Sequence, residues 1–416
     1  MDIVESLIAL NTCMQIGALT QWLVDGKKGK IYLSRLLECY AVCTIIVALV
    51  LLLYGIFTYD DDFHKSGNDI GHTVDYIQII GIRVAHAVTI LEAFLQRHSQ
   101  SLFVKQVREI DRIFECSLNV DVDNRALRTQ LIRRGIIMLA IYLASELFIL
   151  FAKFLVKDRH FSIYWLFYLL PFFICGLRYF QIFVAITIVR QRLDKLLLTL
   201  NELNLLNSKQ KQATNSNSNT NIKFISQTLP IYETSEYLHR HYDMENPDMK
   251  RLLIIRDLYN RLWESTCTLN RDFGISILIN VGNDFISITS NCYWIFLNFK
   301  GYSATFNDFL QIASSAVWSV PHVFNVLILA LLCDRTAQKT TAIALGLHRI
   351  ETNIWNDNHN TVIEQFSLQL LHQKLVFSAA GFFDINCTLL YAIAGATTTY
   401  LIILIQFHMS ENRVTS

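Results

Sequence analysis

The sequence has few charged residues and few prolines for a chain of its length. Of its 416 residues, 17% are charged and four are proline, whereas 52% are hydrophobic. Length alone would suggest two or three soluble domains. Such a chain, however, has too little polar surface to cover those domains in water. The composition therefore excludes an ordinary soluble protein and indicates a protein that is embedded in a membrane.

Most of the patterns that carry enzyme chemistry are also missing. The sequence has no Gly-rich phosphate loop, no Ser-His-Asp spacing and no paired-carboxylate site. His239 and His241 stand two residues apart in a polar loop, which we interpret as solvated rather than as a zinc site. We therefore expect no catalysis, no bound metal, no cofactor and no nucleic-acid partner. The lack of an internal repeat also counts against a transporter built from inverted repeats.

Apolar stretches of about 20 residues recur along the chain, and a helix of that length crosses a hydrocarbon core roughly 30 Å thick. We find seven, near residues 36–57, 73–95, 135–155, 162–188, 273–297, 308–333 and 388–407. The first residues do not match a signal peptide, because Asp2 and Glu5 stand where basic residues are expected. We therefore expect an all-α membrane protein whose first span is its membrane anchor.

The positions of lysine and arginine predict how the spans are oriented. If the N-terminus is cytoplasmic, 28 of the 36 basic residues fall on the cytoplasmic side and six on the outer side, while Arg83 and Arg178 lie within spans. Without the longest loop the division is still 16 to six. Because basic residues collect on the cytoplasmic side, we expect a cytoplasmic N-terminus and an extracellular C-terminus. A G-protein-coupled receptor has the reverse orientation.

This topology divides the chain into alternating membrane and cytoplasmic parts. They are a cytoplasmic N-terminus (1–35), four spans (36–190), cytoplasmic helices (191–272), two spans (273–333), anchor helices (334–387), a last span (388–407) and an extracellular tail (408–416). The low-complexity stretch 207–221 is expected to be a disordered linker. Cys292 alone among the nine cysteines approaches the outer face, so we expect no structural disulfide.

Several spans continue as helices beyond the membrane. From Phe161 to about Leu206 the helical pattern runs for about 45 residues, or about 67 Å, which is roughly twice the hydrocarbon thickness. Further leucine and isoleucine stripes at helical spacing occupy 246–271, 334–352 and 361–385. Since these stripes have no lipid to face, we expect a cytoplasmic helical bundle that carries subunit assembly.

The last apolar stretch ends in the motif "TYLIILIQF", in which Thr399 and Tyr400 precede five hydrophobic residues and the pair Gln406 and Phe407. With the N-inside, seven-span topology, this motif resembles that of the insect gustatory receptors. The resemblance implies a homo- or heterotetrameric cation channel, related to the insect odorant receptors and opened by small-molecule tastants in the plasma membrane of gustatory neuron dendrites. It also implies that the last helix lines a central pore and that the ligand binds among spans two to six. Sugar receptors of this family often carry glutamate where this chain has Leu401, so a bitter or other non-sugar ligand is favoured over a sugar.

The residues of the last span are consistent with a pore lining. Steps of three and four residues back from Gln406 lead through small and polar side chains: Ile402, Thr399, Gly395, Ala392 and Thr388. The alternative is a helix-packing face, since small residues also serve as contacts between membrane helices. The resemblance favours the pore, with these lining and gate residues: Thr399, Tyr400, Ile402, Ile403, Gln406 and Phe407. Gln406 and Phe407 point about 100° apart, so only one of them faces the axis fully.

Charged residues inside spans are costly and mark candidate ligand-binding positions. Together with aromatic residues nearer the outside, they give a predicted ligand pocket of Arg83, Glu146, Trp165, Arg178, Asp284, Trp294 and Trp318. One alternative is a structural ion pair, such as Arg83 with Asp284. Another is that the tryptophans belong to the aromatic belt at the membrane interface.

The predicted topology can be tested with epitope tags on intact cells. A C-terminal tag is expected to be labelled without permeabilisation and an N-terminal tag only after it, because 28 basic residues lie on the predicted inner side and six on the outer. A G-protein-coupled receptor would give the opposite pattern, and a secondary transporter would show uptake without channel currents. A C-terminal tag that is labelled only after permeabilisation would contradict both the topology and the channel.

Overall fold

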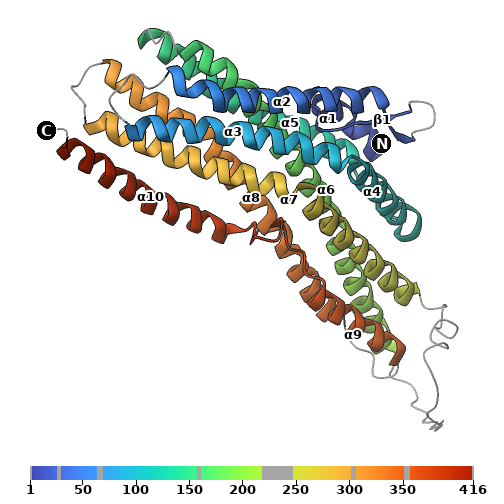
Figure 1. The fold of residues 1–416 in the computed structure, drawn as a ribbon. Helices are drawn as coiled ribbons and strands as arrows, with labels where there is room; N and C mark the ends of the chain where they lie inside the picture. The colour runs from blue at the N-terminus through green and yellow to red at the C-terminus, as the bar shows by residue number, and fades with distance from the viewer. Residues whose placement is uncertain are drawn as a thin grey trace.

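In the computed structural model, residues 2–25, 30–62, 69–156, 161–217, 247–300, 306–350 and 357–414 are described. Ten helices account for most of this part of the chain (Figure 1). They are α1 (Ile3–Ile16), α2 (Arg35–Asp62), α3 (Asp69–Leu95), α4 (Arg97–Leu118), α5 (Asn124–Val156), α6 (Phe161–Asn217), α7 (Pro247–Lys300), α8 (Phe306–His348), α9 (Asp357–His372) and α10 (Cys387–Val414). Two short antiparallel pairs complete it: β1 (Trp22–Val24) with β2 (Ile31–Leu33), and β3 (Ser378–Ala379) with β4 (Phe383–Asp384).

Seven of these helices are long and apolar enough to cross a membrane, which confirms the predicted all-α fold with seven spans. They are α2, α3, α5, α6, α7, α8 and α10. As predicted, three of them are much longer than a bilayer requires, with 57 residues in α6, 54 in α7 and 43 in α8. Helices of that length extend well past a hydrocarbon core that about 20 residues would span.

The surplus halves of α6, α7 and α8 form a second bundle with α9, at an angle to the membrane-spanning one (Figure 1). Its interior is apolar, with Leu200, Leu252 and Phe366 fully buried. Tyr259 packs there against Phe366, with ring centroids 6.0 Å apart, and its hydroxyl donates to the Gln373 carbonyl over 2.6 Å. This is the bundle that the leucine stripes predict, on the side predicted to be cytoplasmic.

The link between this bundle and the last span differs from the prediction. The stripe predicts a helix over 361–385, whereas α9 ends at His372 and the β3–β4 turn separates it from α10. Ala380 and Gly381 at the tip have φ of 50° and 78°. A left-handed turn of this kind favours glycine and interrupts a right-handed helix. The direction of α10 is therefore independent of that of α9.

The end of α6 also differs from the predicted linker 207–221. The helix continues through Asn217, although six of the eleven residues after Leu206 are Asn, Ser or Thr, which are weak helix formers. The remaining residues of the predicted linker lie outside the described part of the chain, within 218–246.

Two helices near the inner ends of the spans have no counterpart in the sequence prediction. Helix α1 begins at the N-cap Asp2, whose side chain accepts from the Val4 amide over 3.3 Å, and it buries Ile3 and Leu7. Helix α4 is amphipathic and buries Val107 and Phe114. The segment predicted only as a cytoplasmic N-terminus is therefore a packed part of the fold.

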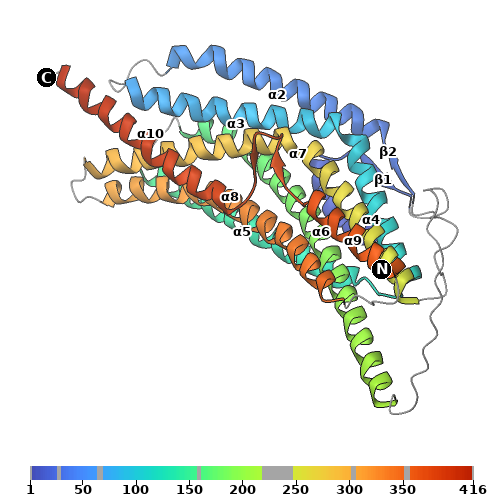
Figure 2. The ribbon, with the colours of Figure 1, turned by 90° about the horizontal axis from the view of Figure 1, so that it is seen from below.

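Helix α10 lies on the outside of the spanning bundle, against α7 and α8 in both views (Figures 1 and 2). Neither view shows a helix covering the opposite side of α10. A single chain therefore leaves most of its last span exposed.

Candidate functional site: the last span and a buried polar network

One side of α10 packs on the rest of the chain. Leu389 and Ile393 contact the hydrophobic core, and the Thr397 hydroxyl lies 3.5 Å from that of Thr289 in α7. Further along, Tyr400 meets the ring of Phe285 edge-on, with centroids 5.8 Å apart. These residues recur at steps of three and four, so they form a single stripe along the helix.

The opposite side of α10 carries the small and polar residues of the predicted pore face. Gln406 is nine residues beyond Thr397, which at 100° per residue places it directly across the helix. Thr399, Ile402 and Gln406 are all exposed, and a Cβ added at Gly395 would meet no atom within 4 Å. Polar groups on this side have no partner element among the described residues, apart from the helix's own carbonyls.

The other predicted pore residues lie on the flank of the helix. Phe407 is seven residues beyond Tyr400, so the two point in nearly the same direction. Phe407 is 61% exposed, whereas Tyr400 is partly covered by Phe285. Ile403, which is 38% exposed, is three residues from both Tyr400 and Gln406 and therefore points midway between them. The structure thus separates Thr399, Ile402 and Gln406 from this flank group.

Asp284 and Trp318, two of the predicted pocket residues, are brought together by a buried chain of polar contacts. Trp318 Nε1 donates to the Tyr168 hydroxyl over 3.1 Å, and that hydroxyl lies 3.2 Å from His322 Nε2. His322 Nδ1 is 2.7 Å from Asp284 Oδ1. The second oxygen of Asp284 accepts from the Tyr179 hydroxyl over 2.6 Å. The chain therefore joins α6, α7 and α8 through the membrane interior.

Aromatic rings surround this polar chain. Phe172 stacks on Tyr142 at 4.6 Å and on Tyr168 at 5.6 Å, and its centroid is 5.5 Å from that of His322. Asn325 Nδ2 donates to the Tyr142 hydroxyl over 2.6 Å. The polar chain is therefore packed among aromatic side chains from α5, α6 and α8.

The sequence analysis did not single out His322, Tyr168, Tyr142 or Phe172. One signal for His322 is present, because an ionisable residue inside an apolar span is unusual enough to mark a candidate site. The aromatic residues carry no comparable signal, since their spans contain many others. These four side chains come together only through the packing of α5, α6 and α8, which the sequence does not show.

One of the remaining predicted pocket residues lies near the cluster, and the others lie elsewhere or outside the description. Glu146 is buried in α5, close enough to Tyr168 to interact with it electrostatically. Arg83 Nη1 donates to the Leu51 carbonyl in α2 over 2.7 Å, and Trp294 Nε1 donates to Asp75 in α3 over 2.8 Å. The side chain of Trp165 lies outside the described part of the structure.

The alternative ion pair of Arg83 with Asp284 is wrong. Asp284 contacts His322 and Tyr179 instead, and Arg83 reaches the backbone of α2. Gly55 makes that approach possible, because a Cβ at this position would clash with the guanidinium. Helical periodicity within one span cannot show which neighbouring span a charged side chain faces.

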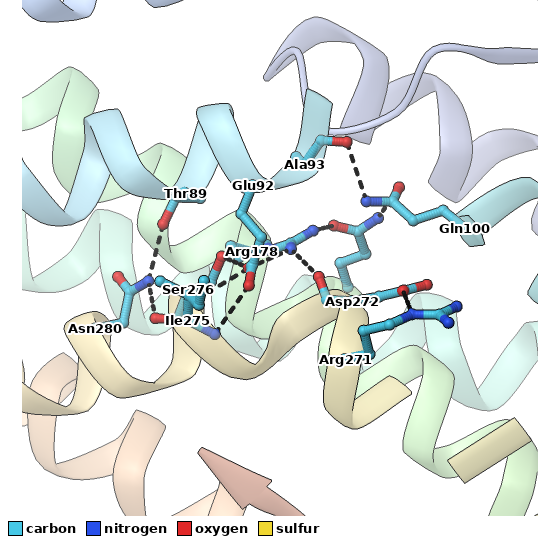
Figure 3. Close-up of polar contacts among 11 residues, drawn as sticks. Thr89, Glu92, Ala93, Gln100, Arg178, Arg271, Asp272, Ile275, Ser276 and Asn280 are labelled. Atoms are coloured by element: carbon cyan, nitrogen blue, oxygen red, sulfur yellow. Dashed lines mark hydrogen bonds and ion pairs between the residues drawn. The ribbon is translucent and has the colours of Figure 1, made fainter. Parts of the chain in front are cut away.

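Arg178 forms a separate buried ion pair with Glu92, near the C-terminal end of α3 (Figure 3). The two groups are 2.9 Å apart, and their side chains are 0% and 5% exposed. Arg178 also donates to the Gln181 side chain and to the Asp272 carbonyl, over 2.9 and 2.8 Å. Its guanidinium lies 4.1 Å above the Phe273 ring.

Glu92 in turn binds the backbone of α7. It accepts from the amides of Ile275 and Ser276 over 2.9 and 3.0 Å, and from the Ser276 hydroxyl. In a regular helix the Ser276 amide would donate to the Asp272 carbonyl, which here receives Arg178 (Figure 3). Side chains that insert into a helical ladder are a known cause of bends.

The α7 residues that this pair contacts, Asp272, Ile275 and Ser276, lie in the middle of that helix, and α7 changes direction between the spanning bundle and the second bundle (Figure 1). Arg178 therefore does not belong with the aromatic cluster around His322. It links α3, α6 and α7 in the middle of α7, and its partner Glu92 was not among the predicted residues.

Comparison of the sequence with known proteins identifies the family of this chain. The profile of the family described as 7tm Chemosensory receptor matches residues 7–411. The chain is 44% identical to gustatory receptor 2a of Drosophila melanogaster, over 100% of this chain and 99% of that protein. It is also 29% identical to gustatory and pheromone receptor 32a of the same organism, over 38% of this chain and 34% of that protein.

The fold has solved counterparts. The insect olfactory receptor OR5 from Machilis hrabei matches with a TM-score of 0.64 and 11% sequence identity, covering 97% of this chain and 98% of that one. The structure of OR5 in complex with eugenol matches with a TM-score of 0.59, again at 11% identity. At this identity the likeness concerns the fold alone.

The ion pair of Arg178 and Glu92 can be tested by thermal unfolding of the purified protein in detergent. Arg178→Met leaves the Glu92 carboxylate buried without its cation and is expected to cost about 3–5 kcal/mol. The double variant Arg178→Met with Glu92→Gln should lose less, because a neutral amide still accepts from the α7 backbone.

Arg97 and Glu38 provide the matched control, since their 2.8 Å pair has side chains that are 23% and 28% exposed. Arg97→Met should cost less than about 1 kcal/mol. Equal losses at the two sites would contradict the assigned role of Arg178.

Proposed function

The chain belongs to the seven-transmembrane chemosensory receptor family, and on that premise we propose that it is a cation channel opened by a small-molecule tastant. One observation carries the proposal: no element in the described part of a single chain covers the face of α10 that contains Thr399, Ile402 and Gln406. Polar groups on a membrane helix are stable facing water or another subunit, and not facing lipid. A pore shared between subunits would give these groups both a water-filled path and a neighbouring subunit to contact.

Assembly around this face completes the proposal. Four copies placed with α10 innermost would surround a central path, as homo- or heterotetramers with related receptors. The cytoplasmic bundle offers further contacts, because Leu368 and Leu371 of α9 are 57% and 60% exposed there. Large exposed leucines away from lipid favour a protein neighbour. This supports the anchor role proposed for 334–387.

The gate is proposed at the outer end of α10. In the closed state, four Phe407 rings narrow the path, and a constriction lined by aromatic carbon excludes hydrated ions. A rotation of each α10 exchanges Phe407 for Gln406, which lies about 100° away on the helix. The amide oxygen then supplies a ligand to the passing cation. Phe407 is free to move in this way, since 61% of it is exposed in a single chain.

The tastant is proposed to bind at the aromatic cluster around His322. Its walls are the rings of Tyr142, Tyr168, Phe172 and Trp318, which suit a planar apolar molecule better than a sugar with many hydroxyls. Leu401, at the position where sugar receptors of the family often carry glutamate, supports the same choice. Eugenol, the ligand in the OR5 complex, is a small molecule of this general kind. A bitter or other non-sugar compound is therefore the proposed stimulus.

A short physical connection runs from this cluster to the pore helix. Asp284 receives the hydrogen bonds of His322 and Tyr179, and its neighbour Phe285 packs on Tyr400 of α10. Ligand binding favours opening only if the open arrangement binds the ligand more tightly. We propose that a shift of α7 at Asp284 turns α10 through the Phe285–Tyr400 contact. The proposed location is the plasma membrane of gustatory neuron dendrites.

The gate is tested by patch-clamp recording from cells that express single-residue variants. Phe407→Ala is expected to give a ligand-independent leak current, because the ring that closes the path is gone. Gln406→Leu should reduce open-channel conductance, because the oxygen ligand is lost.

Surface labelling must show equal expression of both variants, and Tyr391→Ala, which alters an 81% exposed residue on the same helix, is the control for a general loss of packing. Wild-type conductance together with no leak would rule out the gate.

The ligand site is tested by dose–response curves. Trp318→Phe removes the N–H that donates to Tyr168 and should raise the half-maximal tastant concentration about tenfold, with unchanged single-channel conductance. Trp294→Phe is the matched control, because that indole donates to Asp75 in α3 and lies outside the cluster. Equal shifts in both variants, or none in Trp318→Phe, would exclude this cluster as the site.

A further inference from the structure

The turn between β3 and β4 rests on the middle of α7, at Gly274. A Cβ added to Gly274 would lie 2.9 Å from the Ala380 nitrogen and 3.0 Å from the Ala380 Cα. The backbone of a tight turn cannot move aside for such an atom as a flexible side chain can. Glycine at position 274 therefore allows the turn to lie directly on the helix.

Asn270, one helical turn before Gly274, binds the strand that leads into the turn. Its Nδ2 donates to the Val376 carbonyl over 2.7 Å, and its Oδ1 accepts from the Ser378 amide over 3.2 Å. One amide side chain thus pairs with the backbone on both sides of the buried Phe377. Because residues i and i+4 share one face of a helix, Asn270 and Gly274 together form a dock for the turn on α7.

The docked turn is joined to α10 with almost no intervening chain. The Ile385 amide donates to the Phe377 carbonyl over 2.8 Å, which closes the hairpin. Asn386 follows, and its Oδ1 accepts from the Thr388 amide over 2.9 Å in the first turn of α10, which begins at Cys387. The dock therefore fixes the place at which the last span starts.

The opposite face of the same stretch of α7 is held by the ion pair of Arg178 and Glu92 (Figure 3). Asp272 and Ser276 each stand two residues beyond a dock residue, about 200° around the helix. The Asp272 carbonyl accepts from Arg178, and the Ser276 amide and hydroxyl donate to Glu92. One short stretch of α7 thus contacts α3 and α6 on one side and the start of α10 on the other.

A second contact between α7 and α10 lies further along the last span, where Phe285 meets Tyr400. Tyr400 is 13 residues beyond Cys387, so the two attachments are about 20 Å apart along α10. One attachment would leave the angle of α10 free. Two separated attachments to the same helix make α10 follow that helix.

From these observations we propose that Asn270 and Gly274 are positioning residues for the pore helix. They hold the β3–β4 turn on α7, so that a movement of α7 at the pair of Arg178 and Glu92 changes the direction of α10. Packed helices move as units between discrete arrangements, so a shift of α7 carries the attached end of α10 with it. The placement of α10 stands on the geometry alone, and its effect on opening rests on the proposed channel function.

The position of α10 is measured by disulfide crosslinking of the full-length protein in lipid nanodiscs. Thr289→Cys with Thr397→Cys places two thiols where the hydroxyls are 3.5 Å apart, and mass spectrometry identifies the joined peptides. Gly274→Ala is expected to slow crosslinking at least about tenfold, because Cα atoms more than about 7 Å apart cannot be bridged. Gly282→Ala is the matched control, since an added Cβ there would meet no described atom within 4 Å.

Asn270→Ala removes both hydrogen bonds to the strand and should also slow crosslinking, which keeps the test decisive if Gly274→Ala does not fold. Asn260→Ala is its control and should leave the rate unchanged, because the Asn260 oxygen accepts from Gln373, ahead of the strand. Unchanged crosslinking in Asn270→Ala and in a folded Gly274→Ala would overturn the proposal.

Single-channel recording without added tastant tests the effect on opening. Both dock variants should raise the spontaneous open probability about tenfold, because α7 no longer holds α10 in its closed direction. Single-channel conductance should not change, because the residues that line α10 are intact. A purely structural role would lower the number of channels at the surface and leave the opening of each channel unchanged.

The two measurements separate this inference from the proposed function. Slower crosslinking with an unchanged open probability, in cells where Phe407→Ala leaks, would overturn the link to gating. If neither the dock variants nor Phe407→Ala carries current, the proposed channel function fails, and the crosslinking rates still decide whether the dock positions α10.

Discussion

Inside a bilayer, a polar group that has no partner cannot turn to water, and this constraint governs the whole molecule. The backbone meets it by forming helices, which is why seven apolar segments appear as long helices. Side chains meet it by pairing. Glu92 and Arg178 satisfy each other together with the backbone of α7, and Asp284 is satisfied by His322 and Tyr179. On α10, the Thr398 and Thr399 hydroxyls donate to the carbonyls of Ala394 and Gly395 in the same helix.

Helix α7 contacts each of the polar and aromatic clusters described above. Glu92 accepts from its Ile275 and Ser276 amides, Asp284 lies about two turns further along, and Phe285 packs on the last span. One helix thus contacts the inner ion pair, the aromatic cluster and the proposed pore helix. A two-state shift of α7 would change all three together, because packed helices move as units rather than deforming continuously.

The sequence predicted the fold well and the ligand cluster only in part. Span length and hydrophobicity are local properties, so the seven helices and the long extensions of α6, α7 and α8 follow from the residues themselves. The exposed face of α10 was also predictable, because 100° periodicity places Gln406, Ile402 and Thr399 on one side. Of the seven predicted pocket residues, Asp284 and Trp318 meet in one network. Arg83, Arg178 and Trp294 serve three other contacts.

By itself, then, the sequence determined the membrane class, the spans, the family and the polar stripe of the last helix, since each depends on spacing along a single segment. Only the tertiary structure decided that Glu92 is the partner of Arg178, that His322 joins Trp318 to Asp284 through Tyr168, and that Asn270 of α7 binds the strand before the β3–β4 turn. Those facts depend on which faces of different helices meet. The physical reason is that a charge buried in a membrane is costly, so its presence in the sequence indicates that it has a partner. Which residue is that partner depends on how the helices are rotated and packed against each other.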